Sequence, residues 1–307
     1  MRVFVTGASG WVGSAVVPEL IEAGHEVTGL ARSDASAEAL VAAGARVRRG
    51  SLDDIDSMRG GAADADGVIH LAFKHDFTDI AAAGAADLAA VQAMGDVLAG
   101  SGKPFAMASG TLMLAMIASG RLGTEDIVPG PELATAPRLG SELAMLAMAE
   151  RGVRTCMVRL SPTVHGDGDR GFTPRLIDIA RDKGFAAYVG DGANRWPAVH
   201  RLDAARLFRL ALEKAPAGSV LHAAGDPGIP FATITATIGR QLDVPATSIS
   251  AAEADAHFGF LGSLVQLDNP TSTELTRQRT GWQPTHPGLI ADLEAGFYFG
   301  AGSRSKY

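Results

Sequence analysis

The stretch Thr6-Gly7-Ala8-Ser9-Gly10-Trp11-Val12-Gly13 decides the fold, because it stands where an apolar segment gives way to a helical one. The segment before it, residues 2–5, is short and apolar, as in a buried parallel strand. The segment after it, residues 14–21, places its apolar side chains on one helix face. We therefore predict a strand, a glycine-rich turn and a helix in succession.

The three glycines of this turn have separate physical roles. Gly7 permits the tight turn, Gly10 removes the Cβ that would keep a pyrophosphate from the backbone, and Gly13 lets the helix pack closely against the strand. The amides at the helix start then face an anion, with the helix dipole behind them. A plain strand–helix turn with incidental glycines is the alternative, and the flanking elements argue against it. The residues assigned to this dinucleotide site are Thr6, Gly7, Ser9, Gly10, Trp11, Val12 and Gly13.

The end of the second predicted strand, residues 26–30, indicates which dinucleotide binds. An acidic residue there would bind a ribose 2′-hydroxyl, whereas an arginine accommodates a 2′-phosphate. The chain has Arg32 and Ser33 at this point, and Arg32 favours NADP over NAD. An ordinary surface arginine in a loop is the alternative.

Segments that suit strands and helices alternate through the first half of the chain. Residues 46–49, 67–72, 104–109 and 154–160 are predicted strands, and the alanine-rich residues 80–98 a long helix. This alternation predicts an α/β fold with a doubly wound parallel sheet, the Rossmann fold. We expect a dinucleotide-binding domain at residues 1–166, with a returning segment near 195–225. A smaller C-terminal substrate-binding lid is expected mainly over residues 167–300.

The carboxyl ends of the parallel strands share one edge of the sheet, and ligands bind beyond that edge. Asp53, after the third strand, would either accept from the adenine amino group or cap the next helix, and both readings stay open. The other residues that we assign to the cofactor from the strand ends are Leu71, Ala72, Lys74 and Ser161.

The composition argues against several classes of function. The formal net charge is −7 and the arginines are scattered, so we expect no nucleic-acid or membrane partner. A single cysteine, Cys156, excludes an internal disulfide. Glycines interrupt the group His165, Asp167 and Asp169, so we predict no metal. No signal peptide and no apolar run of ~20 residues is evident, which leads us to expect a soluble cytoplasmic protein.

Taken together, several segments resemble the extended short-chain dehydrogenase/reductase superfamily, which includes nucleotide-sugar epimerases, dehydratases and dihydroflavonol reductases. The resemblance runs from residue 1 to about residue 290 and implies this fold and a nicotinamide cofactor. It also implies that a homodimer is the commonest assembly. The segments that carry it are residues 6–13, 50–53 (Gly-Ser-Leu-Asp), 70–72 (His-Leu-Ala), 159–166 (Arg-Leu-Ser-Pro-Thr-Val-His-Gly), 199–203 (Val-His-Arg-Leu-Asp) and 281–284 (Gly-Trp-Gln-Pro).

The chain departs from the superfamily at its catalytic tyrosine and lysine. Arg138 stands at the tyrosine position and Glu142 at the lysine position, so the chain resembles an atypical subgroup. Residues four apart on a helix share a face, so we expect Arg138 and Glu142 to pair and to face the site. There Glu142 would accept hydrogen bonds from the ribose diol, and Arg138 would polarise a carbonyl. An exposed helix salt bridge is the alternative.

A reductase would also need a hydroxyl at the carbonyl oxygen and a proton donor. The resemblance places Ser109 at the serine position after the fifth strand, where its hydroxyl would hold the carbonyl oxygen. Histidine titrates nearest neutrality, so we favour His75 and His200 as donors, with water as a rival. A single loop histidine is more often a structural hydrogen-bonding group.

The leading hypothesis is an NADP-dependent oxidoreductase that reduces a ketone or aldehyde on a small, fairly apolar substrate, that is, a ketoreductase. One alternative is an enzyme like the nucleotide-sugar epimerases and dehydratases. The other is a non-catalytic NADP-binding sensor or regulator, which the missing dyad favours. The expected pocket walls are Phe73, Leu112, Met113, Phe172, Tyr188 and Trp196, and the arginines available for a sugar-diphosphate clamp are Arg170, Arg175 and Arg195.

Overall fold

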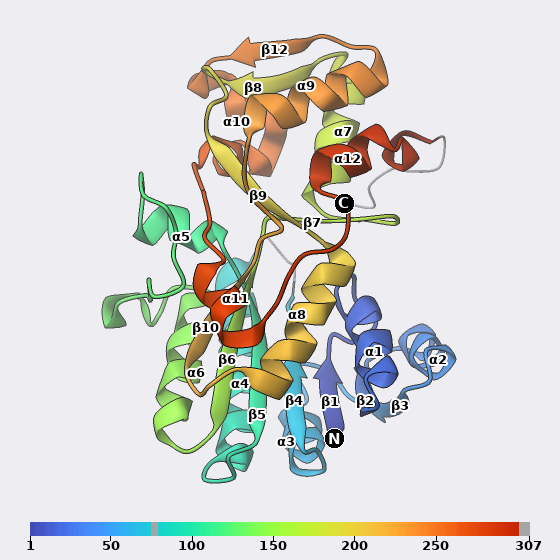
Figure 1. Ribbon diagram of the computed structural model, residues 1–307, viewed down its shortest axis with the longest axis vertical. Helices are drawn as coiled ribbons and strands as arrows, with labels where there is room; N and C mark the ends of the chain where they lie inside the picture. Colours follow the sequence, from blue (N-terminus) through green and yellow to red (C-terminus); the bar gives the residue numbers. More distant parts are fainter. Residues whose placement is uncertain (75–78, 301–307) are drawn as a thin grey trace.

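The computed structural model describes residues 1–74 and 79–300, and its larger part is built on a seven-stranded parallel sheet (Figure 1). The strand order is β10-β6-β5-β4-β1-β2-β3, so the direction of winding reverses between β1 and β4. The predicted doubly wound α/β fold is confirmed. The strands are β1 (Arg2–Thr6), β2 (Glu26–Ala31), β3 (Arg46–Arg49), β4 (Gly67–His70), β5 (Pro104–Gly110), β6 (Arg154–Leu160) and β10 (Ser219–Ala223).

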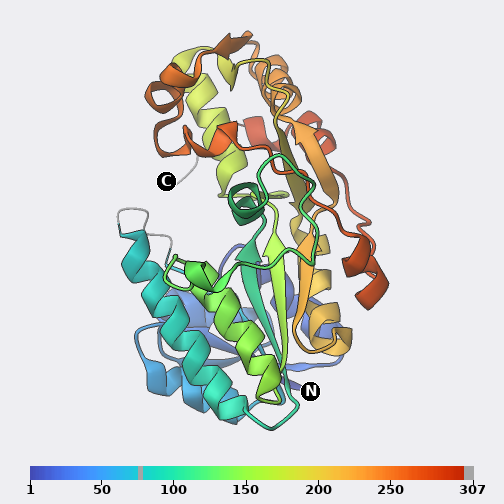
Figure 2. The ribbon, with the colours of Figure 1, turned by 90° about the vertical axis from the view of Figure 1, so that its left-hand side faces the viewer.

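Helices cover both faces of this sheet because successive strand residues point to opposite sides. Val3 and Val5 of β1 lie in one core cluster with α1 and α8, whereas Phe4 lies in the other with α3, α4 and α6. Figure 2 shows α4 and α6 side by side on the second face. The helices are α1 (Gly13–Glu22), α2 (Asp34–Ala42), α3 (Ile55–Ala63), α4 (Ile80–Leu98), α5 (Leu112–Ile117), α6 (Leu139–Glu150) and α8 (Arg201–Lys214).

Helix α4 corrects the expectation that no apolar segment is long enough to cross a bilayer. It has 19 residues and, by length and composition alone, would pass as a membrane span. In the structure it packs between α3 and α6 and buries the carboxylate of Asp87 against Ser141. These contacts are those of a core helix.

The upper part of the molecule has its own small sheets and its own core (Figure 1). Trp196, expected in a pocket wall, is instead fully buried in this core, with its ring 5.2 Å from that of Phe231. The sheets have the orders β11-β9-β7 and β12-β8. The elements are β7 (Thr163–His165), α7 (Phe172–Lys183), β8 (Ala186–Val189), β9 (Arg195–His200), β11 (Asp226–Pro230), α9 (Phe231–Leu242), β12 (Ala246–Ile249), α10 (Ala254–Phe258) and α12 (Leu289–Glu294).

The chain returns to the large sheet twice after β7. Helix α8 and strand β10 form the first return, whereas β9 belongs to the upper three-stranded sheet. Helix α11 (Glu274–Thr280) and the buried Trp282 form the second, and the Trp282 indole donates to the Asp203 carbonyl oxygen at 2.9 Å. The upper part is therefore made of several separate chain segments.

Candidate functional site

The glycine turn between β1 and α1 has no room for side chains at two of its three glycines. Gly7 has a φ of +64°, and a Cβ there would lie 2.6 Å from the Ala72 amide nitrogen. A Cβ on Gly13 would lie 2.2 Å from the Gly7 carbonyl oxygen. Gly10 is exposed, and a Cβ there would approach only the Gly7 oxygen, at 3.1 Å. The lack of space at Gly7 and Gly13 agrees with a tight turn and close helix packing, and the role of Gly10 at a pyrophosphate stays a prediction.

The start of α1 carries unused hydrogen-bond donors. The amides of Trp11, Val12 and Gly13 donate to none of the residues that the structure describes, and no side chain caps the helix. Free amides at a helix N-terminus, with exposed Ser9 and Gly10 in front of them, suit a diphosphate. The turn therefore fits the diphosphate of a pyridine dinucleotide.

Trp11 links this turn to the upper part of the molecule. Its indole nitrogen donates to the Val164 carbonyl oxygen of β7 at 2.8 Å, and the Arg201 guanidinium lies 4.2 Å from its ring centroid. Burial lowers the pKa of Arg201, against the opposing effect of Asp167 and Asp169, but a guanidinium stays charged. Arg201 thus adds a cation near the turn. Arg201 lies within residues 199–203, which carry the superfamily resemblance, but no local pattern in the sequence predicts its place beside the turn.

The Thr6 side chain holds the turn through hydrogen bonds inside the protein. This corrects the prediction that Thr6 contacts the cofactor. Its side chain is fully buried, and its hydroxyl accepts from the Leu71 and Ala72 amides, both at 3.2 Å. Those two amides are therefore also engaged inside the protein. With two donors already bound, the Thr6 hydroxyl donates its own hydrogen to His70 Nδ1, at 2.7 Å.

This pattern assigns the tautomer of His70 within a buried chain of hydrogen-bonded side chains. Because His70 Nδ1 accepts, Nε2 carries the hydrogen and donates to Asp87 at 3.2 Å. Ser141 of α6 donates to the other Asp87 oxygen at 2.6 Å. Burial opposes ionisation of Asp87, but its bonds to His70 and Ser141 and the nearby Arg138 charge hold its pKa below the ordinary value. The chain joins the turn to the start of α6.

Arg138 lies immediately before α6, in a left-handed backbone conformation with a φ of +65°. Its Nη2 donates to the Ala108 carbonyl oxygen at 2.9 Å, and its guanidinium lies 4.2 Å from the Phe73 ring centroid. Burial lowers its pKa, against the opposing charges of Asp87 and Glu142. Two contacts therefore hold this cation at the end of β5.

Ser109 is the residue that follows Ala108, so it lies one peptide away from this contact. Its side chain is 3% exposed, and its hydroxyl has no hydrogen-bond partner in the described part of the chain. A buried hydroxyl without a partner is costly, and a substrate oxygen would satisfy it. Ser109 and Arg138 together form the polar end of the candidate site.

Comparison with known proteins places the chain in a family. The sequence model of the NAD-dependent epimerase/dehydratase family matches residues 3–224. The chain belongs to this family. An uncharacterized protein of Schizosaccharomyces pombe is 50% identical over 300 residues, covering 97% of this chain and 100% of the relative.

More distant relatives have described activities. A 4-hydroxy-2-methyl-3-oxo-4-farnesyl-3,4-dihydroquinoline-1-oxide ketoreductase of Stigmatella aurantiaca is 28% identical over 276 residues, covering 84% of this chain and 80% of the relative. The crystal structure of the dTDP-glucose 4,6-dehydratase DesIV of Streptomyces venezuelae, with NAD bound, superposes with a TM-score of 0.75. That protein is 20% identical, with 97% of each chain covered, so the likeness concerns the fold.

In this epimerase/dehydratase-family chain, Glu142 does not occupy the predicted position. It is fully buried, and its two oxygens accept from Arg159 of β6 at 3.1 and 2.7 Å. The expected pair with Arg138, with both side chains facing the site, is therefore wrong. The reason is that α6 begins at Leu139, so Arg138 lies outside the helix and the four-residue spacing does not apply.

The buried Arg159–Glu142 pair also has polar neighbours that accept hydrogen bonds from Arg159. Arg159 donates to the Ile127 carbonyl oxygen at 2.9 Å and lies 3.4 Å from His222 Nε2. Burial, with the Arg159 charge, lowers the pKa of His222 to about 3, so this ring is neutral. The pair holds α6 to the sheet.

His200, a favoured proton donor, caps a helix instead. Its Nδ1 accepts from the Leu202 amide at 3.2 Å at the start of α8, and its ring stacks on His286 at 4.6 Å. Burial and the neighbouring His165 lower its pKa. His165 in turn binds Asp292 of α12 at 2.6 Å, and the bond from the Leu202 amide to His200 joins this group of rings to α8. His75 lies outside the described residues.

At the adenine end, three predicted residues, Ser33, Asp53 and Lys74, have structural partners. Ser33 caps α2 by accepting from the Ser36 amide at 3.2 Å, and Asp54, not Asp53, caps α3. Asp53 instead accepts from Lys74 at 2.5 Å, an ion pair between the loops after β3 and β4. The hydroxyl of Ser161 donates to the Ala223 carbonyl oxygen at 2.7 Å.

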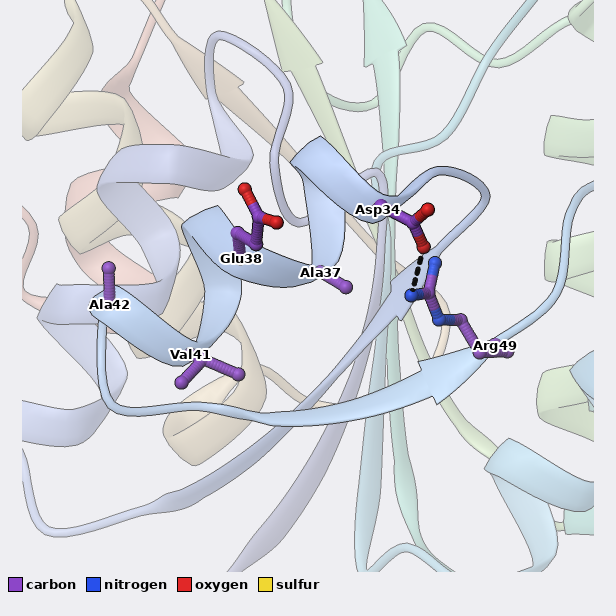
Figure 3. Close-up of a pocket in the computed structure, with 6 residues that line it drawn as sticks. All are labelled: Asp34, Ala37, Glu38, Val41, Ala42 and Arg49. Carbon is purple, nitrogen blue, oxygen red and sulfur yellow. Dashed lines mark hydrogen bonds and ion pairs between the residues drawn. The ribbon is translucent and has the colours of Figure 1, made fainter.

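Arg32 has no ion-pair partner among the described residues and is exposed. A second cation, Arg49, ends the neighbouring strand β3 and is held by Asp34 at 2.5 Å. Figure 3 shows this pair among the residues of α2 and the end of β3 that line a pocket. Within residues 1–74 and 79–300, no group of three or more His, Cys, Asp or Glu side chains could hold a metal ion.

Proposed function

We propose that the protein is an NADP-dependent oxidoreductase that reduces a ketone or aldehyde. The observation that carries this proposal is the Ser109 hydroxyl, which has no partner among the described residues and directly follows Ala108, the residue whose carbonyl oxygen holds the Arg138 guanidinium. Both lie at the sheet edge that also carries the dinucleotide turn. A bound reduced nicotinamide would supply a hydride to the carbonyl carbon. Ser109 would donate to the carbonyl oxygen and Arg138 would stabilise the negative charge that develops there.

The proton that completes the alcohol then comes from water. Arg138 cannot supply it, because a guanidinium does not lose its proton in the accessible pH range. Ser109 acts as a donor of a hydrogen bond only. His200 is committed to its helix cap through Nδ1 and takes no part in this proposal.

Arg32 supports NADP as the proposed dinucleotide, since its exposed guanidinium follows β2, where the 2′-phosphate would lie. The relative from Stigmatella aurantiaca, a ketoreductase, supports carbonyl reduction. A sugar-diphosphate clamp is not favoured, because Arg195 is engaged by Asp268 at 2.7 Å.

We also propose that the protein acts in the cytoplasm as a soluble homodimer, with neither nucleic acid nor membrane as a partner. The net charge of −7 and the superfamily resemblance support this. Light scattering of the purified protein measures the assembly directly.

The function is tested by following NADPH absorbance while a panel of ketones and aldehydes is added. We expect turnover of part of the panel, and a loss of at least about ten-fold in kcat for Ser109→Ala with an unchanged Kd for NADPH. Tight NADPH binding with no turnover on any compound would instead identify a sensor.

A further inference from the structure

The Arg138 guanidinium keeps most of its donors free. Of its five N–H groups, one on Nη2 donates to the Ala108 carbonyl oxygen at 2.9 Å. The others donate to no residue in the part of the chain that the structure describes. Asp87, the carboxylate whose charge acts most strongly on Arg138, is itself satisfied by His70 and Ser141.

The free donors still include one complete fork. A guanidinium offers two parallel N–H pairs, one from Nε and Nη2 and one from Nη1 and Nη2, and each uses a different hydrogen of Nη2. Ala108 takes one hydrogen of Nη2, so the pair that uses the other hydrogen stays complete. Such a pair binds two oxygens that lie in one plane.

The orientation of this fork is fixed. One face of the guanidinium lies against the Phe73 ring, the Ala108 bond holds one edge, and the residue is only partly exposed. Ala108 is joined by a peptide bond to Ser109, whose hydroxyl lacks a partner among the described residues. A carbonyl held by Ser109 would therefore lie one residue along β5 from the carbonyl oxygen that holds the fork.

We propose that Arg138 selects carbonyl substrates with an oxygen on the neighbouring carbon, that is, 1,2-diketones or 2-oxo acids. This inference rests on the proposed reductase function. The two oxygens of such a unit, when on the same side, match the two parallel donors. The hydride reduces one carbonyl to an alcohol with a proton from water, and the neighbouring group is unchanged.

The test compares matched ketones on wild type and two variants of Arg138. The measurement is kcat/KM with NADPH for 2,3-butanedione, pyruvate and 2-butanone. For each protein, kcat/KM for 2,3-butanedione is divided by kcat/KM for 2-butanone. The difference in intrinsic reactivity between the ketones cancels when this ratio for a variant is divided by the ratio for wild type. We expect this ratio to fall at least about ten-fold in Arg138→Gln and also in Arg138→Lys, which keeps the charge but loses the fork.

The outcomes separate the two proposals. A ratio that Arg138→Gln leaves unchanged, or that Arg138→Lys preserves, would overturn the fork and leave the reductase standing. No turnover of any ketone would overturn both. If Arg138→Gln lowers the pyruvate to 2-butanone ratio more than the 2,3-butanedione to 2-butanone ratio, relative to wild type, the fork is assigned to 2-oxo acids, and the reverse order assigns it to 1,2-diketones.

A measurement on wild type alone covers the case in which the variants do not fold. Methyl oxamate carries two neighbouring carbonyl oxygens and resists reduction, whereas acetamide has one. We expect methyl oxamate to compete with the ketone substrate at least about ten-fold more tightly than acetamide. Equal inhibition by the two compounds would contradict the proposal.

Discussion

The glycine turn and the start of α6 lie at the same edge of the sheet, yet they obey different kinds of constraint. In the turn, Gly7 and Gly13 are required by backbone atoms within a few residues or on the adjacent β4 end. At the start of α6, Glu142 is held by Arg159, a residue 17 positions away on β6. A site whose residues are required by backbone sterics can be predicted from a short motif. The prediction of a site that depends on side-chain pairing also requires knowing where a helix begins.

The largest effect should follow from Gly13→Ala, which tests the steric half of this comparison. The added Cβ would lie 2.2 Å from the Gly7 oxygen, a backbone atom that cannot move aside. We expect a loss of more than about 3 kcal/mol in unfolding free energy, measured by urea denaturation. Gly10→Ala is the matched control and should fold normally. Equal stability of the two variants would contradict the argument.

Glu142→Ala tests the pairing half. Removing one partner of a fully buried ion pair leaves Arg159 uncompensated, which costs about 3–5 kcal/mol. Urea denaturation measures this loss of unfolding free energy in Glu142→Ala. The double variant Glu142→Leu with Arg159→Met has no buried charge at this pair, so it should recover much of the loss. A loss of unfolding free energy below about 0.5 kcal/mol in Glu142→Ala is typical of an exposed helix pair and would contradict the buried position of Glu142.

These two regions also show how far the sequence carries the fold and the site. The strands near residues 46–49 and 154–160 and the helix over 80–98 agree with the prediction because each has a local pattern. The role of Asp87 was missed, although a carboxylate in the middle of an alanine-rich helix was a signal that it is paired. Nothing local indicates that Arg138 adopts a φ of +65° and leaves the helix, or that Trp196 packs into a core assembled from segments far apart.

The buried environment of Arg159 also predicts a dependence of stability on pH. Burial lowers the folded-state pKa of His222 to about 3, so the unfolded chain binds one more proton between that value and the ordinary value of 6.5. Stability from this group therefore falls as pH drops from 6.5, by about 1.4 kcal/mol per unit. Urea denaturation of wild type and His222→Gln at several pH values measures the slope. Identical slopes would contradict the assignment of this ring as neutral.

The smallest effect concerns Arg32, whose assignment again rests on local sequence. Arg32→Ala should weaken NADPH binding by about ten-fold, since one charged hydrogen bond to the 2′-phosphate is lost, and leave NADH binding unchanged. Titration calorimetry with both dinucleotides measures this, and Arg46→Ala, on the exposed start of β3, is the control. Equal losses for NADPH and NADH would remove NADP from the proposal.

The indole of Trp11 gives the molecule an internal optical probe. Trp11 is half-buried beside the unused amides and bonded to Val164, whereas Trp196 and Trp282 are fully enclosed in separate cores. We expect the fluorescence response to an added oxidised dinucleotide, which does not absorb tryptophan emission, to come mainly from Trp11, so Trp11→Phe should remove most of it. In a single titration, the tryptophan emission of an unlabelled sample then reports dinucleotide binding at the turn and the contact between Trp11 and Val164 of β7.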